Sequence, residues 1–171
     1  YMMETASPDS AHWRAWLDST SHRANAVGRL DQFHRNMSAA YRNLAEGYFK
    51  RDRLEQAVKA LTTALRYEPE RISTRRALAK AYVQLGIDNY FSKKREMAKA
   101  AFDQALLLEP DNVEARINLG WSFYEEGMLD SAINQFQRVL RLHPSSHAHF
   151  NLALCYLALG KLELSRNTYA E

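Results

Sequence analysis

The sequence predicts an all-α protein built as a stack of antiparallel helix pairs behind an N-terminal helical extension. Good helix formers are abundant, whereas Gly (6) and Pro (4) are few among the 171 residues, which disfavours a sheet protein with many turns. Hydrophobic residues make up 46% of the chain and recur at three- and four-residue spacing, as in helices with one buried face. One apolar pattern also recurs along the chain, which indicates a repeat array.

Four copies of this pattern cover residues 38–171. Their bounds are 38–71, 72–112, 113–146 and an incomplete unit from 146. The third unit shows the pattern most clearly, as Leu119, Gly120, Phe123, Gly127, Ala132, Phe136, Val139 and Pro144. The copies upstream are Leu44, Ala45, Tyr48, Ala57, Leu61, Ala64 and Pro69, and then Leu78, Ala79, Tyr82, Gly86, Ala98, Phe102, Ala105 and Pro110. The last copy is Leu152, Ala153, Tyr156, Gly160, Ser165 and Tyr169.

Each residue type in the pattern has a physical role in a helix pair. The apolar residues place one face of each helix against the other. Gly120 and the Ala residues at its position allow a close approach, and Gly86, Gly127 and Gly160 are suited to the left-handed conformation that ends a helix. Pro residues stop the second helices. Since each pair exposes an apolar face that only a neighbour can bury, stability is shared along the stack.

The pattern resembles the tetratricopeptide repeat, whose signature is Leu-Gly-x-x-Tyr followed by Ala-x-x-x-Phe, Ala and Pro. The resemblance implies a right-handed superhelix whose first helices line a concave groove. The units depart from it where the family has a Trp in the first helix, because Tyr41, Arg75, Arg116 and His149 stand there.

The second unit is seven residues longer than the first and third, with the extra residues around Ile87 to Lys93. Seven residues are about two helical turns, so the helix phase is nearly kept. We expect the first helix of this unit to run to about Phe91 and to turn near Ser92-Lys93. Tyr90 and Phe91 would then extend beyond the stack, either as a contact point or packed under a neighbouring turn.

Residues 1–37 do not match the repeat. Ser7-Pro8-Asp9 predicts a helix start, and apolar residues from Trp13 and Trp16 to Met37 follow at helical spacing. Ser19-Thr20-Ser21-His22 is weakly helical and predicts a break or kink. We interpret the segment as a helical cap over the apolar face of the first unit; occupation of the groove by Trp13 and Trp16 is the alternative.

No motif for catalysis, a cofactor or a metal is found, so the sequence predicts a non-enzymatic protein without cofactors. His143, His147 and His149 lie close in sequence, but His147 and His149 are two residues apart on a helix and point to different faces. Glu125 and Glu126 are adjacent on a predicted helix, so their side chains do not face each other and cannot act as an acid/base pair. The single Cys155 excludes an internal disulfide and, between Leu154 and Tyr156, is expected to be buried.

Charge and composition narrow the class of partner. Lys and Arg outnumber Asp and Glu by 14 to 9 in residues 1–85, giving +5, and are outnumbered by 9 to 11 in residues 86–171, giving −2. This imbalance is too small for a dedicated nucleic-acid binder, despite the short basic runs 75–76 and 93–95. No apolar run is long enough to span a bilayer. The start is no signal peptide, so the cytoplasm is favoured, and we expect the chain to be part of a longer protein.

The resemblance makes the concave groove the candidate site. The family lines this groove with positions 2, 5, 6, 9, 12 and 13 of each unit. The residues we select from these positions are Arg42, Asn43, Glu46, Arg76, Lys80, Ile117, Asn118, Trp121, Tyr124, Phe150, Asn151, Leu154 and Leu157. Further positions of the same set are Ala39, Phe49, Lys50, Ser73, Ala77, Val83, Gln84, Glu114, Glu125, His147 and Ala158.

Asn43, Asn118 and Asn151 share one repeat position, and an Asn amide can both donate to and accept from a peptide backbone. The family uses such a series to hold extended peptides, although Ala77 interrupts it here and the residues could instead join neighbouring helices. The family's clamp for acidic chaperone C-termini is essentially absent, because Ala77 and Glu114 stand at two of its positions.

We therefore expect a protein-interaction scaffold that binds a peptide or helix of a partner protein. The apolar part of the partner would lie against Trp121 and its apolar neighbours, and an acidic or polar part near Arg42, Arg76 and Lys80. Trp121→Ala should abolish binding without unfolding the array. The alternative is a structural spacer or self-assembly module, with association through a C-terminal edge that leaves Leu152, Tyr156 and Tyr169 uncovered.

Overall fold

The structure is a computed structural model that describes the backbone of residues 9–170 and the side chains of Ser19 and residues 24–170. The described residues form eight α-helices and no strand, so the predicted all-α class is confirmed. Their bounds are α1 Asp9–Phe49, α2 Leu54–Tyr67, α3 Ile72–Phe91, α4 Arg95–Leu108, α5 Val113–Glu125, α6 Leu129–Leu142, α7 Ser146–Ala158 and α8 Leu162–Ala170. None of these helices is both long and apolar enough to cross a membrane.

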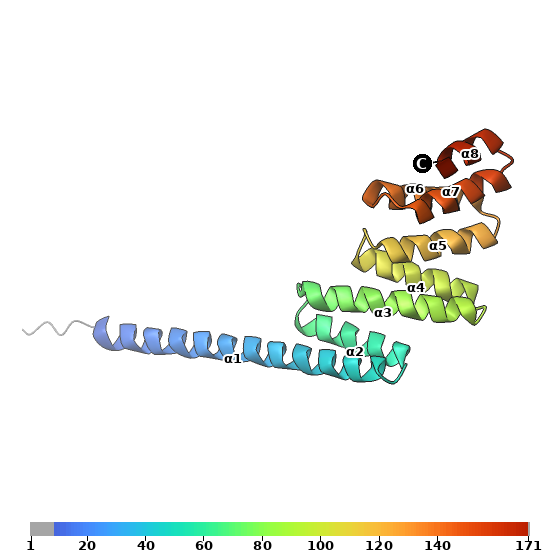
Figure 1. The fold of residues 1–171 in the computed structure, drawn as a ribbon. Helices are drawn as coiled ribbons and strands as arrows, with labels where there is room; N and C mark the ends of the chain where they lie inside the picture. Colours follow the sequence, from blue (N-terminus) through green and yellow to red (C-terminus); the bar gives the residue numbers. More distant parts are fainter. Residues whose placement is uncertain (1–8, 171) are drawn as a thin grey trace, which may run out of the picture.

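The helices form antiparallel pairs that stack in chain order, as the repeat predicts. Each odd-numbered helix packs against the even-numbered helix that follows it, and the pairs are joined by α2–α3, α4–α5 and α6–α7 contacts. Figure 1 shows the result, a one-dimensional stack with α1 at one end and α7 and α8 at the other. Pro69, Pro110 and Pro144 all lie two residues past the ends of α2, α4 and α6, where a residue without an N–H closes a helix.

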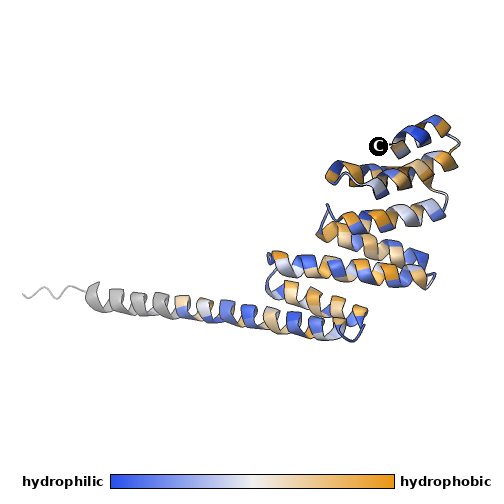
Figure 2. Ribbon diagram, in the orientation of Figure 1, coloured by the Kyte–Doolittle hydropathy of each residue, from blue (hydrophilic) through white to orange (hydrophobic). Residues whose placement is uncertain are grey.

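The core runs continuously between the pairs instead of forming one central cluster. Ala57, Ala98 and Ala132 are completely buried near the starts of their helices, and the rings of Phe102 and Phe136 are completely buried one turn later. Figure 2 shows hydrophobic residues concentrated in the stacked helices, whereas the described part of α1 outside the stack is predominantly hydrophilic. Each pair is thus stabilised both by the contact between its own two helices and by its neighbours in the stack.

The N-terminal segment corrects two expectations. Helix α1 runs from Asp9 to Phe49 without interruption, so the break predicted at Ser19–His22 is wrong; a few weak helix formers cost only tenths of a kcal/mol each, too little to end a helix. The segment also prolongs α1 out of the stack (Figure 1) and does not fold over the first pair as a cap. Val27, Leu30 and Phe33 are accordingly exposed. Ser7 and Pro8, and the side chains of Trp13 and Trp16, lie outside the described residues.

The insertion in the second unit lengthens α3, as predicted. The helix reaches Phe91 and the chain turns at Ser92 to Lys94. The Tyr90 side chain packs against the cluster of Ala98, Phe102 and Leu119, and its hydroxyl donates a hydrogen bond to the Glu125 carboxylate. Burial and this bond raise the pKa of Tyr90 to about 12. Of Tyr90 and Phe91, it is Phe91 that projects into solvent, with 78% of its surface exposed.

Gly86 has a different role from the one expected of it. It does not end a helix: it lies inside α3, and a Cβ added there would come within 2.5 Å of the Phe102 ring. Gly120 stands against Phe136 in the same way in the third unit. The seven inserted residues therefore move the point of close approach from Ala79 to Gly86, two turns further along the helix.

The turns between paired helices use one left-handed residue each, at equivalent places. These residues are Asp52, Lys93, Gly127 and Gly160, with φ between 55° and 75°. Gly takes this conformation without steric cost, whereas a side chain brings the Cβ too close to the following carbonyl oxygen. Two of the four turns are therefore strained.

Lys93→Gly is expected to raise the free energy of unfolding by about 1 kcal/mol, because it removes this strain from the α3–α4 turn. Urea denaturation followed by circular dichroism would measure the change. Ser92→Gly is the matched control, since Ser92 has a φ of −77° and Gly there gains nothing. Equal effects of the two substitutions would show that the left-handed conformation is not the cause.

Candidate functional site: the groove lined by the first helices

A hollow of about 310 Å³ lies between α1 and α3, where the repeat predicts the concave groove. Six of its lining residues belong to the predicted groove positions: Arg42, Asn43, Glu46, Phe49, Ser73 and Ala77. Buried Ala45 and Leu61 complete the wall. The walls are thus apolar in part, while the polar groups come mainly from α1.

The polar groups of this hollow differ in how they are held. The Glu46 carboxylate accepts from Lys50 one turn later at 2.7 Å, and this hydrogen bond and charge lower the pKa of Glu46. Arg42 is half-buried, and its Nε is buried without a hydrogen-bond partner. Asn43 is exposed, with no hydrogen bond to the rest of the described chain. The hollow therefore offers the Asn43 amide to a ligand, and Arg42 adds a positive charge to its wall.

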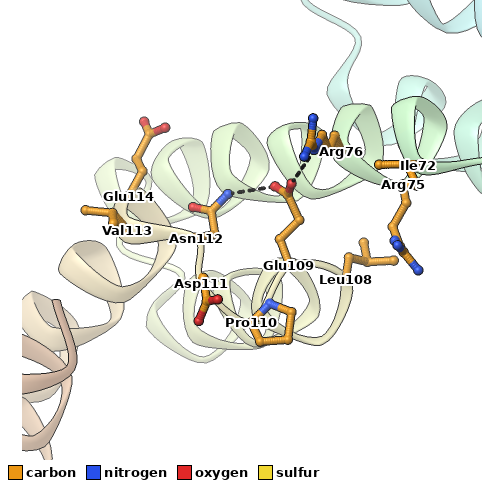
Figure 3. Close-up of a pocket in the computed structure, with 10 residues that line it drawn as sticks. All are labelled: Ile72, Arg75, Arg76, Leu108, Glu109, Pro110, Asp111, Asn112, Val113 and Glu114. Atoms are coloured by element: carbon orange, nitrogen blue, oxygen red, sulfur yellow. Dashed lines mark hydrogen bonds and ion pairs between the residues drawn. The ribbon is translucent and has the colours of Figure 1, made fainter. Parts of the chain in front are cut away.

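A larger hollow, of about 640 Å³, lies where α3 begins and the α4–α5 turn passes it (Figure 3). Arg76 pairs with Glu109 at 3.5 Å, and the Asn112 amide donates to the same carboxylate at 3.1 Å. The Arg75 side chain points away from the Arg76–Glu109 ion pair and lies near Leu108 (Figure 3). Helix α3 has 20 residues and α4 has 14, so the first turn of α3 extends past the end of α4 and leaves this space.

The predicted apolar half of the groove is divided by the structure. Trp121 is half-buried, with its ring 5.3 Å from that of Tyr124 and 6.1 Å from that of Phe136 between centroids. Trp121 and Tyr124 pack against the cluster that contains buried Leu152 and Cys155. Both side chains therefore pack at the cluster that joins the third and fourth pairs, and neither is fully open to a partner. Ile117 is half-buried nearby on α5.

The C-terminal residues of the predicted set face a different space. Phe150, Leu154 and Leu157 line a hollow of about 340 Å³ together with Leu162 and Tyr169 of α8. This hollow is at the open end of the stack. At that edge the expectation for Leu152 is wrong, because it is 6% exposed, whereas Tyr169 is 69% exposed as predicted. Tyr156 is half-buried against the third pair.

The three Asn residues of the predicted series are not alike. Asn43 is exposed, Asn118 is half-buried, and Asn151 is 6% exposed. The Asn118 amide donates to the Glu114 carbonyl one turn earlier in the same helix, at 2.8 Å. The exposure of these side chains thus decreases from Asn43 to Asn118 to Asn151, and Asn43 has the most accessible amide of the three. Lys80 is exposed on α3 and lines none of the hollows described above.

The remaining candidates take structural positions. Cys155 is completely buried, and burial raises the pKa of its thiol to about 11, which disfavours the reactive thiolate. Within the described side chains, no three His, Cys, Asp or Glu residues gather as metal ligands would. Lys99 joins α4 to the end of α5 through Glu126 at 2.8 Å, and Arg95 lies 4.0 Å from Glu125.

Arg116 is a residue whose role the sequence did not reveal. It occupies the family's Trp position, is 5% exposed, and donates to Gln135 at 3.2 Å and to the Pro110 carbonyl. Burial and the nearby charges of Arg138 and Arg141 lower the pKa of Arg116. It fastens the α4–α5 turn to α6. In the sequence, this role is indicated only by the presence of a charged residue, Arg116, at a position where the family has a core Trp.

The comparisons with known proteins agree with this architecture. The family model of the tetratricopeptide repeat matches residues 90–135 and 119–171. Human intraflagellar transport protein 88 homolog is 29% identical over 94 residues, which are 51% of this chain and 11% of that protein. The uncharacterized protein ycf37 of Cyanophora paradoxa is 33% identical over 106 residues, which are 62% of this chain and 60% of that protein. The chain thus spans only part of each relative's length.

Solved structures share the fold. A tetratricopeptide repeat protein from Parabacteroides merdae superposes with a TM-score of 0.60 at 18% identity, over 79% of this chain and 52% of that one. A structure of MamA superposes with a TM-score of 0.56 at 22% identity, over 89% of this chain and 81% of that one. The repeat pattern, the paired helices and the matched residues 90–171 agree, so this chain contains tetratricopeptide repeats.

Proposed function

We propose that this chain is a non-enzymatic scaffold that holds a segment of a partner protein in the hollow between α1 and α3. Repeat arrays of this kind support protein interaction in general. The proposal rests on one observation: six residues at predicted groove positions, from two different helices, line one open hollow. The hollow is concave, partly apolar and edged by a few polar groups, which are the features of a recognition site.

The walls of the hollow indicate the chemistry of the partner. Phe49, Leu61 and Ala77 offer an apolar surface to one side chain of the partner. Asn43 can pair with a backbone amide beside that side chain. Arg42 would attract an acidic or polar residue next to it. We therefore expect a peptide segment or helix with one apolar anchor flanked by an acidic residue.

Filling the hollow tests this expectation. A library of random 12-residue peptides displayed on phage is the probe, and peptides that bind the parent chain are measured again with variants. Ala77→Leu should weaken the selected peptides by at least about tenfold, because the added atoms occupy the space of the anchor. Asn43→Ala should weaken them by about threefold to tenfold through the lost amide pair.

The control is Ala24→Leu, the same change at an exposed position of α1 outside the stack. It should bind the peptides like the parent. Far-UV circular dichroism of each variant would show whether the helices are intact. Peptides that share an apolar and acidic pattern yet bind Ala77→Leu as tightly as the parent would place the site elsewhere.

A second candidate function, a self-assembly module, is favoured by a different observation. Phe150, Leu157, Leu162 and Tyr169 leave a contiguous apolar surface exposed at the end of the stack. Contiguous apolar patches of this kind usually mark interfaces.

A further inference from the structure

The turn between α3 and α4 exposes an aromatic ring next to three cations. Phe91 is 78% exposed, and the four residues that follow it are all exposed as well. Lys93 and Lys94 form no ion pair with any described carboxylate, and Arg95 lies 4.0 Å from Glu125. The turn therefore presents a large apolar side chain and positive charge side by side to the solvent.

The stability of the fold does not account for these cations. Lys93 has a φ of 61°, at the place where Gly127 and Gly160 stand in the two later turns, so its side chain costs strain. Lys94 caps the N-terminus of α4 without a side-chain hydrogen bond, and the positive end of the helix dipole opposes a cation there. A side chain held in an unfavourable backbone conformation points to a role outside the fold.

Two further turns lie along the same edge of the stack. The α3–α4, α5–α6 and α7–α8 turns form a row on one side in Figure 1, and the α1–α2 turn is set back from it. Helix α3 has 20 residues, whereas α5 and α7 have 13 each, so the insertion carries its turn about two helical turns further. The α5–α6 turn adds Met128, 40% exposed, and the α7–α8 turn adds exposed Lys161. We call the exposed side chains of these three turns the basic edge: Phe91, Lys93, Lys94, Arg95, Met128 and Lys161.

Most carboxylates beside the basic edge are paired within the protein. Glu96 and Glu126 bind Lys99 at 3.0 and 2.8 Å, and Glu125 binds Arg95 and the Tyr90 hydroxyl. Asp88 and Asp130 are exposed and form no ion pair, but they lie in α3 and α6 and not in the turns themselves. The positive charge of the turns is therefore only partly cancelled by the fold.

We propose that the basic edge binds the surface of a membrane that contains anionic lipids. Charge complementarity selects this occupant, because Lys and Arg beside an exposed aromatic ring are typical of protein segments at a charged bilayer surface. In this contact Phe91 and Met128 enter the boundary between headgroups and acyl chains, and the cations lie at the level of the headgroups. The edge is a row of turns whose residues line none of the hollows described above, so it suits a broad surface.

A nucleic acid fits this edge less well. Its phosphates would pair with the cations, but single strands are held by stacking successive bases on several rings, and the basic edge has one ring, Phe91. The edge shares no residue with the hollow between α1 and α3. Membrane binding at the edge and peptide binding in that hollow can therefore be tested separately.

Co-sedimentation of the chain with vesicles tests the proposal. Vesicles of phosphatidylcholine with about 30% phosphatidylserine should bind the chain, vesicles of phosphatidylcholine alone should not, and about 0.5 M NaCl should release it. Lys93→Gly, which removes one cation, should weaken binding about fivefold, and Lys94→Glu about 25-fold because it replaces a cation with an anion. Phe91→Ala should weaken binding about threefold, since no ring then enters the bilayer.

Lys93→Gly and Lys94→Glu also separate membrane binding from folding. The first removes the left-handed strain, and the second places a carboxylate at the positive end of the α4 dipole. Both variants should therefore resist urea at least as well as the parent while they bind vesicles more weakly. A side chain with a structural role alone would not give this combination.

The matched controls lie away from the basic edge. Lys59 is exposed in the middle of α2, so Lys59→Glu should bind vesicles within about twofold of the parent. Leu107 is 74% exposed in the last turn of α4, so Leu107→Ala should bind like the parent. Three results would overturn the proposal: no binding of the parent to the anionic vesicles at about 5 mM lipid, equal losses for Lys59→Glu and Lys94→Glu, or binding of a single strand of about 20 nucleotides that depends on Lys94 while vesicles do not bind. The last result would assign the edge to a nucleic acid.

Discussion

Replacing Trp121 with Ala is expected to lower the free energy of unfolding by about 3 kcal/mol, the lower end of the range for removing a large aromatic side chain from a core. The ring lies against Tyr124 and Phe136 and helps to cover the cluster that contains Leu152 and Cys155. Its removal leaves a space in the contact between the third and fourth pairs. The fourth pair, which has a neighbour on one side only, should then unfold first.

Urea denaturation followed by circular dichroism would measure this loss, and hydrogen exchange would locate it in α7 and α8. The control is Phe91→Ala, because Phe91 is 78% exposed and its truncation should change stability by less than about 0.5 kcal/mol. The sequence led us to expect Trp121→Ala to remove partner binding without affecting the array. If Trp121→Ala proved as stable as Phe91→Ala, the ring would be an available binding anchor after all.

Gly86→Ala is expected to lower the free energy of unfolding by about 2 kcal/mol, even though Ala is the better helix former. The added Cβ would lie 2.5 Å from a carbon of the Phe102 ring. That ring is completely buried, so it cannot turn away without displacing α3 or α4. The overpacking should therefore outweigh the gain in helix propensity, which is about 1 kcal/mol.

The matched control is Gly28→Ala, the same change in a helix where the added Cβ meets nothing within 4 Å. It should keep or raise stability, by up to about 1 kcal/mol. Thermal unfolding of both variants beside the parent would compare them directly. A Gly86→Ala variant more stable than the parent would contradict the close contact of α3 with the Phe102 ring.

The position of Gly86 shows where reasoning from a repeat pattern stops. Aligned by number, Gly86 corresponds to Gly127 and Gly160, which end their helices with a positive φ. The seven extra residues, however, allowed two choices: an insertion in the turn or an extension of the helix. The extension was predicted correctly, but the role predicted for Gly86 was wrong. In the longer helix Gly86 stands against Phe102 as Gly120 stands against Phe136, and Lys93 takes the left-handed turn.

The sequence by itself determined the helix pairs, their order and the residues of the groove between α1 and α3. These follow from local periodicity, from turn residues and from contacts that each unit makes with the next, all of which are short-range along the chain. A continuous helix from Asp9 to Phe49 was not predicted, because Ser and Thr weaken a helix without ending it.

Only the tertiary structure decided which apolar groove residues are open. Tyr124 and Leu157 stand at the same repeat position, yet Tyr124 is half-buried against the cluster of Leu152 and Cys155 while Leu157 is 51% exposed. Their difference depends on whether a further helix lies against them, which no local pattern records. The same holds for Leu44 and Leu78, whose exposed fractions are 45% and 4%. In a stack that is stabilised by neighbours, a residue's burial is set by its place in the array as much as by its type.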